Sequence, residues 1–214
     1  MQSNRLNSGR LVELERDKSS FESLTDLELW RKFKEGDEGA FVFIYKKYID
    51  VLYQSGIQLT SNDALVKDCI QDFFISIREK ISGLGDTDNI KLYLIKSFRR
   101  KVIETLGKHK RFIGQELPVE AYPVELATDT KMINEQFTAD QLKKLNAAMG
   151  SLKAKDREII YYYFYENLSY GKIAEILDYD HVSSARRSVY KVLDRLKKYL
   201  LIFMVIHFIK FHVL

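Results

Sequence analysis

The chain has 214 residues, which is room for one large domain or two small ones. It is 46% hydrophobic and 30% charged, a composition that supports a buried core and excludes a low-complexity chain. With 10 glycines and 2 prolines there are few breaks for a many-stranded sandwich, so we expect an all-α fold. The single cysteine, Cys69, excludes a disulfide framework and a cysteine-based zinc site. No apolar run follows Met1, so we expect no signal peptide and a cytoplasmic location.

The net charge of +4 is unevenly distributed along the chain. Residues 91–111 contain eight basic residues and one acidic residue, and residues 183–198 contain six and one. The rest of the chain is therefore net acidic. Two basic stretches in such a chain indicate two separate contacts with a polyanion such as DNA. A solvated helix face explains either stretch alone equally well.

The first half of the chain predicts four helices after a flexible tail at residues 1–20. Thr25 and Glu28 form a capping-box pattern that starts the first helix, and Gly36 ends it. Asp37 is expected to cap the second helix. The third helix carries a paired apolar stripe at helical spacing. Its members are Leu65, Val66, Cys69, Ile70, Phe73, Phe74, Ile77 and Ile81.

A polar loop at residues 83–89 separates the third helix from the fourth. Gly83 and Gly85 break the apolar stripe, and the segment from Asp86 to Asn89 offers caps for the next helix. In that fourth helix we expect four residues to face inward: Leu92, Ile95, Val102 and Leu106.

Both prolines lie between Lys108 and Thr130, in a stretch without a clean apolar period. This stretch predicts a flexible linker, for which we take residues 112–137. Four further helices are predicted, near 138–149, 155–166 and 169–177 and from about 183 onward. The predicted fold is thus two small helical bundles joined by a linker, each with its own basic helix.

Residues 168–198 have the layout of a helix-turn-helix. Ser169 is expected to cap a short helix, residues 178–182 to form a polar turn, and Ser183 or Ser184 to cap the second helix. The outward face of this second helix carries Arg186, Arg187, Tyr190 and Lys191. An arginine fork can bond both acceptors on a guanine edge, so this face suits a DNA duplex. An αα-corner with a basic solvent face is the alternative interpretation.

The basic helix of the first bundle interleaves Tyr93, Phe98 and Phe112 with its lysines and arginines. Aromatic faces stack on unpaired bases while the cations neutralise phosphates, which suits melted DNA. The adjacent 83–89 loop could grip an extruded base. The same aromatic spacing equally fits a helix whose rings face the core.

Five motifs in order resemble the extracytoplasmic-function (ECF) sigma factors of bacterial RNA polymerase. The first is similar to the family's G-D-x-x-A-F opening: Gly36, Asp37, Ala40, Phe41, Ile44, Tyr45 and Tyr48. The second is similar to its D-x-x-Q-[ED]-x-F motif: Asp68, Gln71, Asp72 and Phe74. The third is similar to its W/Y-L helix: Tyr93, Leu94, Arg99, Ile103, Glu104 and Leu106.

The remaining two motifs lie in the second bundle. One resembles the family's R-E-[VI] and E-G-L-S-Y-x-E-I-A-x-I-L pattern: Arg157, Glu158, Ile159, Glu166, Leu168, Ser169, Tyr170, Ile173, Ala174, Ile176 and Leu177. The other is the ending at residues 183–198, in which an A-[RK] pair precedes Y-K. The chain departs from the family at its two turn glycines, which are Asn167 and Asp178 here, at an asparagine replaced by Arg100, and at Leu152-Lys153 for the usual L-P. Asparagine and aspartate both tolerate a left-handed backbone.

The resemblance implies a transcription initiation factor that binds core RNA polymerase and directs it to promoters. Residues 21–111 would bind the β′ clamp helices through Asp68, Gln71 and Asp72. The same domain would bind the melted −10 strand through Lys96, Arg99, Arg100, Lys101, Asp86 and Asn89. Residues 138–199 would bind the β flap, and would bind the −35 duplex through Ser183, Ser184, Arg186, Arg187, Tyr190 and Lys191. An anti-sigma factor is a further candidate partner.

Two other classes of protein remain open from the residues. A dimeric helix-turn-helix regulator would share the second module but has no need of the Asp68–Asp72 pattern. An enzyme is disfavoured, because the four histidines are scattered and the chain has no Gly-rich phosphate loop or metal-ligand spacing. We therefore expect no catalysis, cofactor, metal or small-molecule substrate.

Residues 200–214 form an apolar tail with only His207, Lys210 and His212 as polar groups. As a helix this tail would span about 22 Å, short of the hydrocarbon core of a bilayer. We expect it to pack on a bundle or contact a partner rather than cross a membrane.

Overall fold

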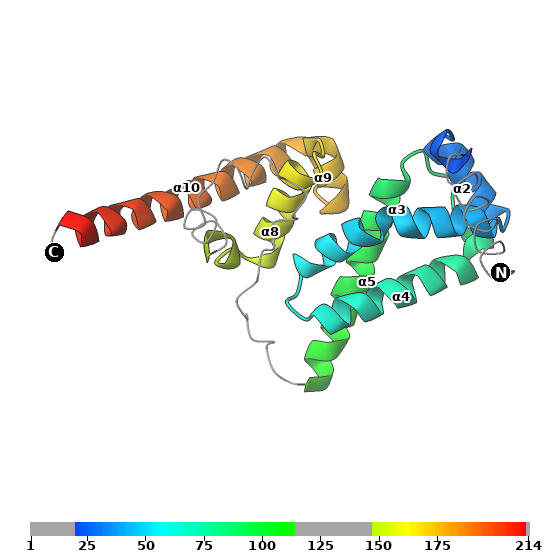
Figure 1. Ribbon diagram of the computed structural model, residues 1–214, viewed down its shortest axis with the longest axis horizontal. Helices are drawn as coiled ribbons and strands as arrows, with labels where there is room; N and C mark the ends of the chain where they lie inside the picture. The colour runs from blue at the N-terminus through cyan, green and yellow to red at the C-terminus, as the bar shows by residue number, and fades with distance from the viewer. Residues whose placement is uncertain (1–19, 114–146, 213–214) are drawn as a thin grey trace, which may run out of the picture. The chain divides into compact units, whose positions relative to one another are not determined.

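The computed structural model describes residues 20–113 and 147–212, with side chains described for 20–109 and 147–198. All regular elements in these ranges are helical, which confirms the all-α fold class. The chain divides into two units: unit 1 comprises Met1–Gly56 and Ala64–Thr105, and unit 2 comprises Ile57–Asp63 and Leu106–Leu214. Figure 1 shows the helices of unit 1 from blue to green and those of unit 2 from yellow to red. Almost all of the predicted tail at 1–20 and linker at 112–137 lies outside the described residues.

Helix α2 (Asp26–Lys34) begins at the predicted capping box. The Thr25 side chain accepts from the Glu28 backbone N–H, and the Glu28 carboxylate accepts from the Thr25 backbone N–H at 2.8 Å. Hydrogen bonds from Thr25 hold the pKa of Glu28 below its usual range. The helix ends before Gly36, whose φ of 90° lies in the left-handed region that favours glycine. Both predicted boundaries of this helix are confirmed.

Helices α3 (Glu38–Ile57) and α4 (Asp63–Glu79) follow, and all but the last residue of α3 and the first of α4 belong to unit 1. The Asp37 Oδ1 atom accepts from the Ala40 N–H at 3.0 Å, which is the predicted cap of α3. In α4 seven members of the predicted stripe are buried: Leu65, Val66, Cys69, Ile70, Phe73, Phe74 and Ile77. Ile81 is the exception, because α4 ends at Glu79 and Ile81 falls in the 3₁₀ turn η1 (Ile81–Gly83).

Helix α5 (Ile90–Ile113) is capped by the preceding residue, Asn89, whose Oδ1 atom accepts from the Leu92 N–H at 2.9 Å. Its inward face differs from the prediction. Ile95 and Val102 are buried as expected, but Leu92 and Leu106 are only partly covered. The remaining core positions are Ile90, Leu94 and Phe98, because residues four apart on a helix share a face.

Phe98 is a core residue and not a base-stacking platform. Its ring is 0% exposed and lies 5.5 Å from the ring of Phe73, centroid to centroid. The helices approach closely here, because a Cβ atom added to Gly56 would lie 2.6 Å from a methyl of Val66. For Phe98, the alternative in which the rings of this helix face the core is therefore correct. The Phe112 side chain lies outside the described residues.

In unit 2 the predicted helix at 155–166 is interrupted. Helix α8 (Ala154–Ile160) passes into a π-helical turn, η2 (Tyr161–Tyr165). Tyr161 and Tyr162 are buried, whereas Phe164 is 55% exposed. The π turn changes which aromatic residues face the core, and a simple helical period cannot predict that change. Of the predicted helix near 138–149, only residues from 147 onward are described, and they are helical.

The helix-turn-helix is formed by α9 (Tyr170–Ile176) and α10 (Val182–His212). Ser169 caps α9 as predicted, since its side chain accepts from the Lys172 N–H. The prediction that Ser183 or Ser184 caps α10 is wrong, because the helix starts at Val182 and places both serines in its first turn. Asn167 and Asp178 have φ angles of 51° and 52°. The expected left-handed backbone at these two positions is confirmed.

Helix α10 continues as one helix to His212, so the apolar segment from residue 200 extends the helix that carries the basic face. Within the part of the chain that the structure describes, none of the helices is long and apolar enough to cross a membrane.

Candidate nucleic-acid and protein interfaces

The outer face of α10 collects the residues expected to read duplex DNA. Arg186, Arg187, Tyr190 and Lys191 are all exposed. The opposite face consists of Ala185, Val189, Val192 and Leu196, which are buried against the rest of the unit. Ser183 is exposed, and Ser184 accepts a hydrogen bond from Arg187 Nη2 at 3.3 Å. One helix therefore separates an apolar packing side from a basic, aromatic outer side, as a recognition helix requires.

Contacts in its first half hold α10 against its neighbours. It packs on α9 and α8. The Tyr179 hydroxyl donates to Ser188 Oγ at 3.0 Å, and the ammonium of Lys155 lies 4.2 Å from the centre of the Tyr179 ring. Further along, Arg195 forms an ion pair with Asp156 at the start of α8. These contacts present the outer face of α10 on a rigid support.

A second candidate site, the basic pocket, lies in unit 1 between α4, the residue 84 loop and α5. Its volume is about 250 Å³. Three cations and one acid are among the lining residues: Lys80, Arg100, Lys101 and Glu104. Tyr93 and Ser97 add an aromatic edge and a hydroxyl. The pocket therefore combines positive charge, an aromatic ring and a hydrogen-bonding group, which are the groups that bind a nucleotide of a single strand.

The prediction for the melted strand is matched only in part by this pocket. Arg100 and Lys101 line it, whereas Lys96 and Arg99 are not among its lining residues. Lys80 lines it without having been singled out in the sequence. It follows the last turn of α4, outside the dense basic stretch of α5, so the charge pattern alone did not identify it. Tyr93 also packs edge-on against Trp30 with ring centroids 5.0 Å apart, so its ring is fixed in place.

The two loop residues expected to grip a base are used to hold the loop. Asp86 forms ion pairs with Lys34 at 2.8 Å and with Arg31 at 3.4 Å. The hydrogen bond from Lys34 is the main cause that lowers the pKa of Asp86. Asn89 caps α5, and the Trp30 indole N–H donates to the Gly85 carbonyl at 2.8 Å. The 83–89 loop is thus fixed to α2 and α5 by these contacts.

The outward face of α4 carries the residues expected to meet the polymerase. Asp68, Gln71 and Asp72 are exposed, opposite the buried stripe. Asp72 forms an ion pair with Lys101 of α5 at 3.2 Å. The family resemblance implies different partners for these two residues, polymerase for Asp72 and DNA for Lys101. The structure brings them together on one surface.

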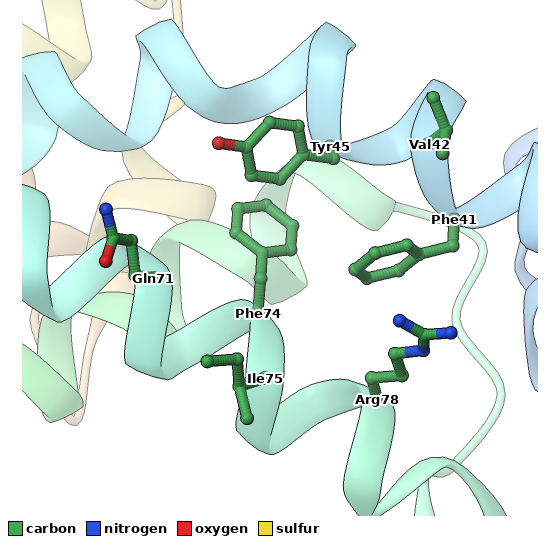
Figure 2. A pocket seen from close by; sticks show the side chains of 7 residues that line it. All are labelled: Phe41, Val42, Tyr45, Gln71, Phe74, Ile75 and Arg78. Carbon is green, nitrogen blue, oxygen red and sulfur yellow. The ribbon is translucent and has the colours of Figure 1, made fainter.

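An apolar groove adjoins this face, between α3 and α4, and has a volume of about 420 Å³. Its lining residues are Phe41, Val42, Tyr45, Gln71, Phe74, Ile75 and Arg78. Figure 2 shows the ring of Phe74 facing that of Tyr45, with Phe41 beside them, Gln71 toward one end and Arg78 toward the other. Ile75 is 57% exposed and adds an apolar side chain to the rim of the groove. The guanidinium of Arg78 lies 5.5 Å from the centre of the Phe41 ring.

Among the described residues there is no group of three or more histidine, cysteine, aspartate or glutamate side chains arranged to hold a metal ion.

Comparison with known proteins gives a family match within unit 2 and a structural match over most of the chain. Residues 148–180 match the family model of sigma-70, region 4. Among solved structures, the chain is similar to the sigma factor RpoE from Bartonella quintana, whose structure was determined in complex with the anti-sigma factor NepR. The TM-score is 0.56 at 20% identity, and the match covers 73% of this chain and 93% of that chain. No curated protein sequence matches the chain.

At that identity the structural match shows the fold, while the family model places region 4 on α8, η2, α9 and the turn that leads into α10. Neither match is to a catalytic family. Together they support the resemblance to sigma factors: residues 148–180 match sigma-70 region 4, and the chain has an all-helical fold similar to that of the sigma factor RpoE.

Proposed function

We propose that this protein is a sigma factor that binds core RNA polymerase, directs it to specific promoters and promotes opening of the DNA strands. The observation that carries the proposal is the position of the exposed basic face of α10. It follows directly on the matched region 4 at residues 148–180. A helix-turn-helix whose second helix presents arginines outward is suited to the major groove of a duplex.

The −35 element is the proposed target of α10. Arg186 and Arg187 supply forks for the acceptor pair on a guanine edge, and Lys191 supplies a charge for a phosphate. Tyr190 adds an apolar ring between them along the helix. Ser183 and Ser184 lie in the first turn, where their short side chains let the helix approach the DNA backbone. The packing on α8 and α9 keeps this face in one orientation.

The basic pocket of unit 1 is the proposed site for the melted −10 strand. Arg100, Lys101 and Lys80 would neutralise phosphates, while Tyr93 would contact an unpaired base at the pocket edge. Lys96 and Arg99, on the same helix, would extend the contact to neighbouring phosphates. The ion pairs of Asp86 and the cap at Asn89 would keep the 83–89 loop open for the strand. These two residues thus act on the DNA site through the loop.

The outward face of α4 and its groove are the proposed contact with the polymerase, including the β′ clamp helices. Asp68 and Asp72 suit basic residues of the partner, and the groove suits an apolar side chain. Unit 2 would in turn dock on the β flap. An anti-sigma factor is proposed as a further partner, supported by the fact that the similar structure from Bartonella quintana was solved with one.

Reconstituted transcription tests the proposal. The purified chain would be added to sigma-free bacterial core polymerase with a library of promoter fragments. We expect discrete start sites that depend on the added protein, and the selected fragments will give the promoter motif. A dimeric helix-turn-helix regulator would instead bind a palindromic duplex without associating with core polymerase, and that result would replace the proposal.

A charge-reversal variant tests the proposed polymerase contact. Asp72→Lys reverses the charge at the centre of the α4 face and places it beside Lys101, so we expect loss of core polymerase in a pull-down. Glu79→Lys makes the same charge change at the end of the same helix and serves as the matched control. If Asp72→Lys retains the polymerase as well as the control does, Asp72 is not part of that interface.

A further inference from the structure

Two adjacent arginines on the outer face of α10 are each held by a different uncharged side chain of the same helix. The guanidinium carbon of Arg186 lies 5.7 Å from the centre of the Tyr190 ring, one turn further along the helix. The Nη2 atom of Arg187 donates a hydrogen bond to Ser184 Oγ at 3.3 Å, one turn back. Residues three or four apart on a helix are neighbours, so both contacts form within α10 alone.

The chemistry of these partners distinguishes the two arginines from a third arginine on the same helix. Arg195 forms an ion pair with Asp156, whose carboxylate neutralises its charge. An aromatic ring and a hydroxyl also restrain a guanidinium, but they carry no formal charge. Arg186 and Arg187 therefore keep their positive charge for a polyanion. Both are exposed, and Tyr190 beside them is 53% exposed, so the whole group is accessible from solvent.

Each of the two arginines also keeps enough hydrogen-bond donors to read a base. A guanidinium carries five N–H donors in a planar fork, and the N7 and O6 acceptors of one guanine use two of them. The bond to Ser184 occupies one donor of Arg187, and the ring of Tyr190 attracts Arg186 through its charge. Successive residues of a helix point about 100° apart, so we expect the two forks to reach different base pairs.

We propose that Tyr190 and Ser184 are positioning residues, and that they orient Arg186 and Arg187 respectively to read two different guanines of the duplex element. This role rests on the proposed binding of α10 to duplex DNA. A long side chain that is already oriented loses less conformational freedom on binding, so more of its contact appears as selectivity. Without its partner, each arginine has to be ordered by the DNA itself.

Replacement of single guanines by 7-deazaguanine provides the test, because this base lacks the N7 acceptor and keeps its Watson–Crick pairing. The full chain would be bound to core polymerase, and its affinity measured on its selected promoter with each guanine of the upstream duplex element replaced in turn. We expect the wild type to lose about fivefold or more at two positions, from the lower end of the effect of an arginine–guanine pair. Arg186→Ala and Arg187→Ala should each abolish the loss at one of these positions, which assigns that guanine to that arginine.

The two positioning residues predict a crossed pattern of effects. Tyr190→Leu should reduce the discrimination at the Arg186 guanine by about twofold or more and leave that at the Arg187 guanine unchanged. Ser184→Ala should reduce the discrimination at the Arg187 guanine and leave the other unchanged. Each variant is thus the control for the other, because a general loss of stability or of DNA affinity does not act on one guanine alone.

Two further variants identify the groups that orient the arginines. Tyr190→Phe keeps the ring, so we expect it to keep the discrimination of the wild type at both guanines. Ser183→Ala removes the neighbouring hydroxyl, which also lies about one turn before Arg187, and should leave both guanines unaffected.

The positioning role is wrong if no guanine is sensitive to 7-deaza substitution, or if Tyr190→Leu and Ser184→Ala keep the full discrimination or lower it equally at both positions. If Tyr190→Phe behaves as Tyr190→Leu does, the ring does not orient Arg186. If Ser183→Ala acts as Ser184→Ala does, the hydrogen bond to Ser184 is not what orients Arg187. Failure of the wild type to direct any transcription would instead overturn the proposed function, and the positioning role with it.

Discussion

In unit 1 the polar residues expected to bind DNA also hold the fold together, whereas in unit 2 they lie on the exposed side of one helix. Asp86 and Asn89 fix the 83–89 loop, and Lys101 pairs with Asp72. Arg186, Arg187 and Lys191 stand on a face whose reverse side performs the packing. Substitutions in unit 1 should therefore change stability and binding together. In unit 2 they should separate the two.

The largest effect is expected in the unit 1 core. Trp30 is 0% exposed, and its indole N–H donates to the Gly85 carbonyl of the loop. We expect Trp30→Ala to lower the free energy of unfolding of unit 1 by about 3–5 kcal/mol. Hydrogen exchange followed by mass spectrometry measures each unit separately. Amides of α2, the 83–89 loop and α5 should lose protection.

The same experiment contains its control, because α9 and α10 belong to the other unit. Their amides should keep wild-type protection. Trp30→Phe retains most of the ring volume but loses the N–H donor, so it should weaken the loop more than the surrounding core. Unchanged exchange in the loop for both variants would show that the Trp30 hydrogen bond does not hold it.

Arg187→Ala is expected to give the opposite pattern in unit 2. Loss of one bidentate contact to a base should cost about 1–3 kcal/mol of binding, or roughly 5- to 160-fold in promoter affinity. The side chain is exposed and donates a hydrogen bond to Ser184 within the same helix, so the thermal midpoint should stay near that of the wild type. Promoter binding by the polymerase complex and thermal unfolding measure the two effects.

Association with core polymerase is the second readout for Arg187→Ala, and it should be unaffected. Lys172→Ala, an exposed cation on α9 outside the α10 face, is a matched loss of one charge in the same unit. We expect a smaller, salt-dependent loss of DNA affinity from it. If Arg187→Ala lowers promoter binding and polymerase binding equally, the α10 face has a structural role after all.

The next effect concerns the residues at the helix starts, where loss of a capping side chain costs about 1 kcal/mol of stability. Asn89 accepts from the Leu92 N–H at the start of α5, so Asn89→Ala should destabilise unit 1 by about 1 kcal/mol. Ser184 lies inside the first turn of α10, and Ser184→Ala should leave the stability of unit 2 almost unchanged. Chemical denaturation of the two variants measures both. Equal destabilisation would mean that Ser184 is a cap and that α10 starts later than Val182.

The sequence predicted the parts of the fold that depend on local rules. The capping box at Thr25 and Glu28, the cap at Asp37 and the apolar stripe of α4 each arise from interactions within a few residues, and all were found. The left-handed positions at Asn167 and Asp178 were likewise identifiable, since they replace turn glycines of the resembling family.

The features that local rules could not predict depend on contacts between elements. Phe98 is apolar at helical spacing on a basic helix, and only its packing on Phe73 shows that it faces the core. The π turn at Tyr161–Tyr165 shifts the helical phase, so a period of 3.6 residues places its aromatic residues wrongly. The basic pocket needs Lys80 from one helix and Arg100 from another, and no sequence spacing connects them.

The smallest expected effect concerns the ion pair between Asp72 and Lys101. Both side chains reach solvent, with exposed fractions of 65% and 33%, so their mutual interaction should contribute only about 0.2–1 kcal/mol to stability. A double-mutant cycle with Asp72→Asn and Lys101→Met measures it, and added salt should reduce it further. Each single variant should have a much larger effect on its own proposed partner, polymerase for Asp72 and DNA for Lys101. A coupling above about 2 kcal/mol would exceed the range for a surface pair and would make Asp72–Lys101 a strut between α4 and α5. Unit 1 would then be even less able than unit 2 to separate binding from folding, because this contact between the two proposed interfaces would itself hold the helices together.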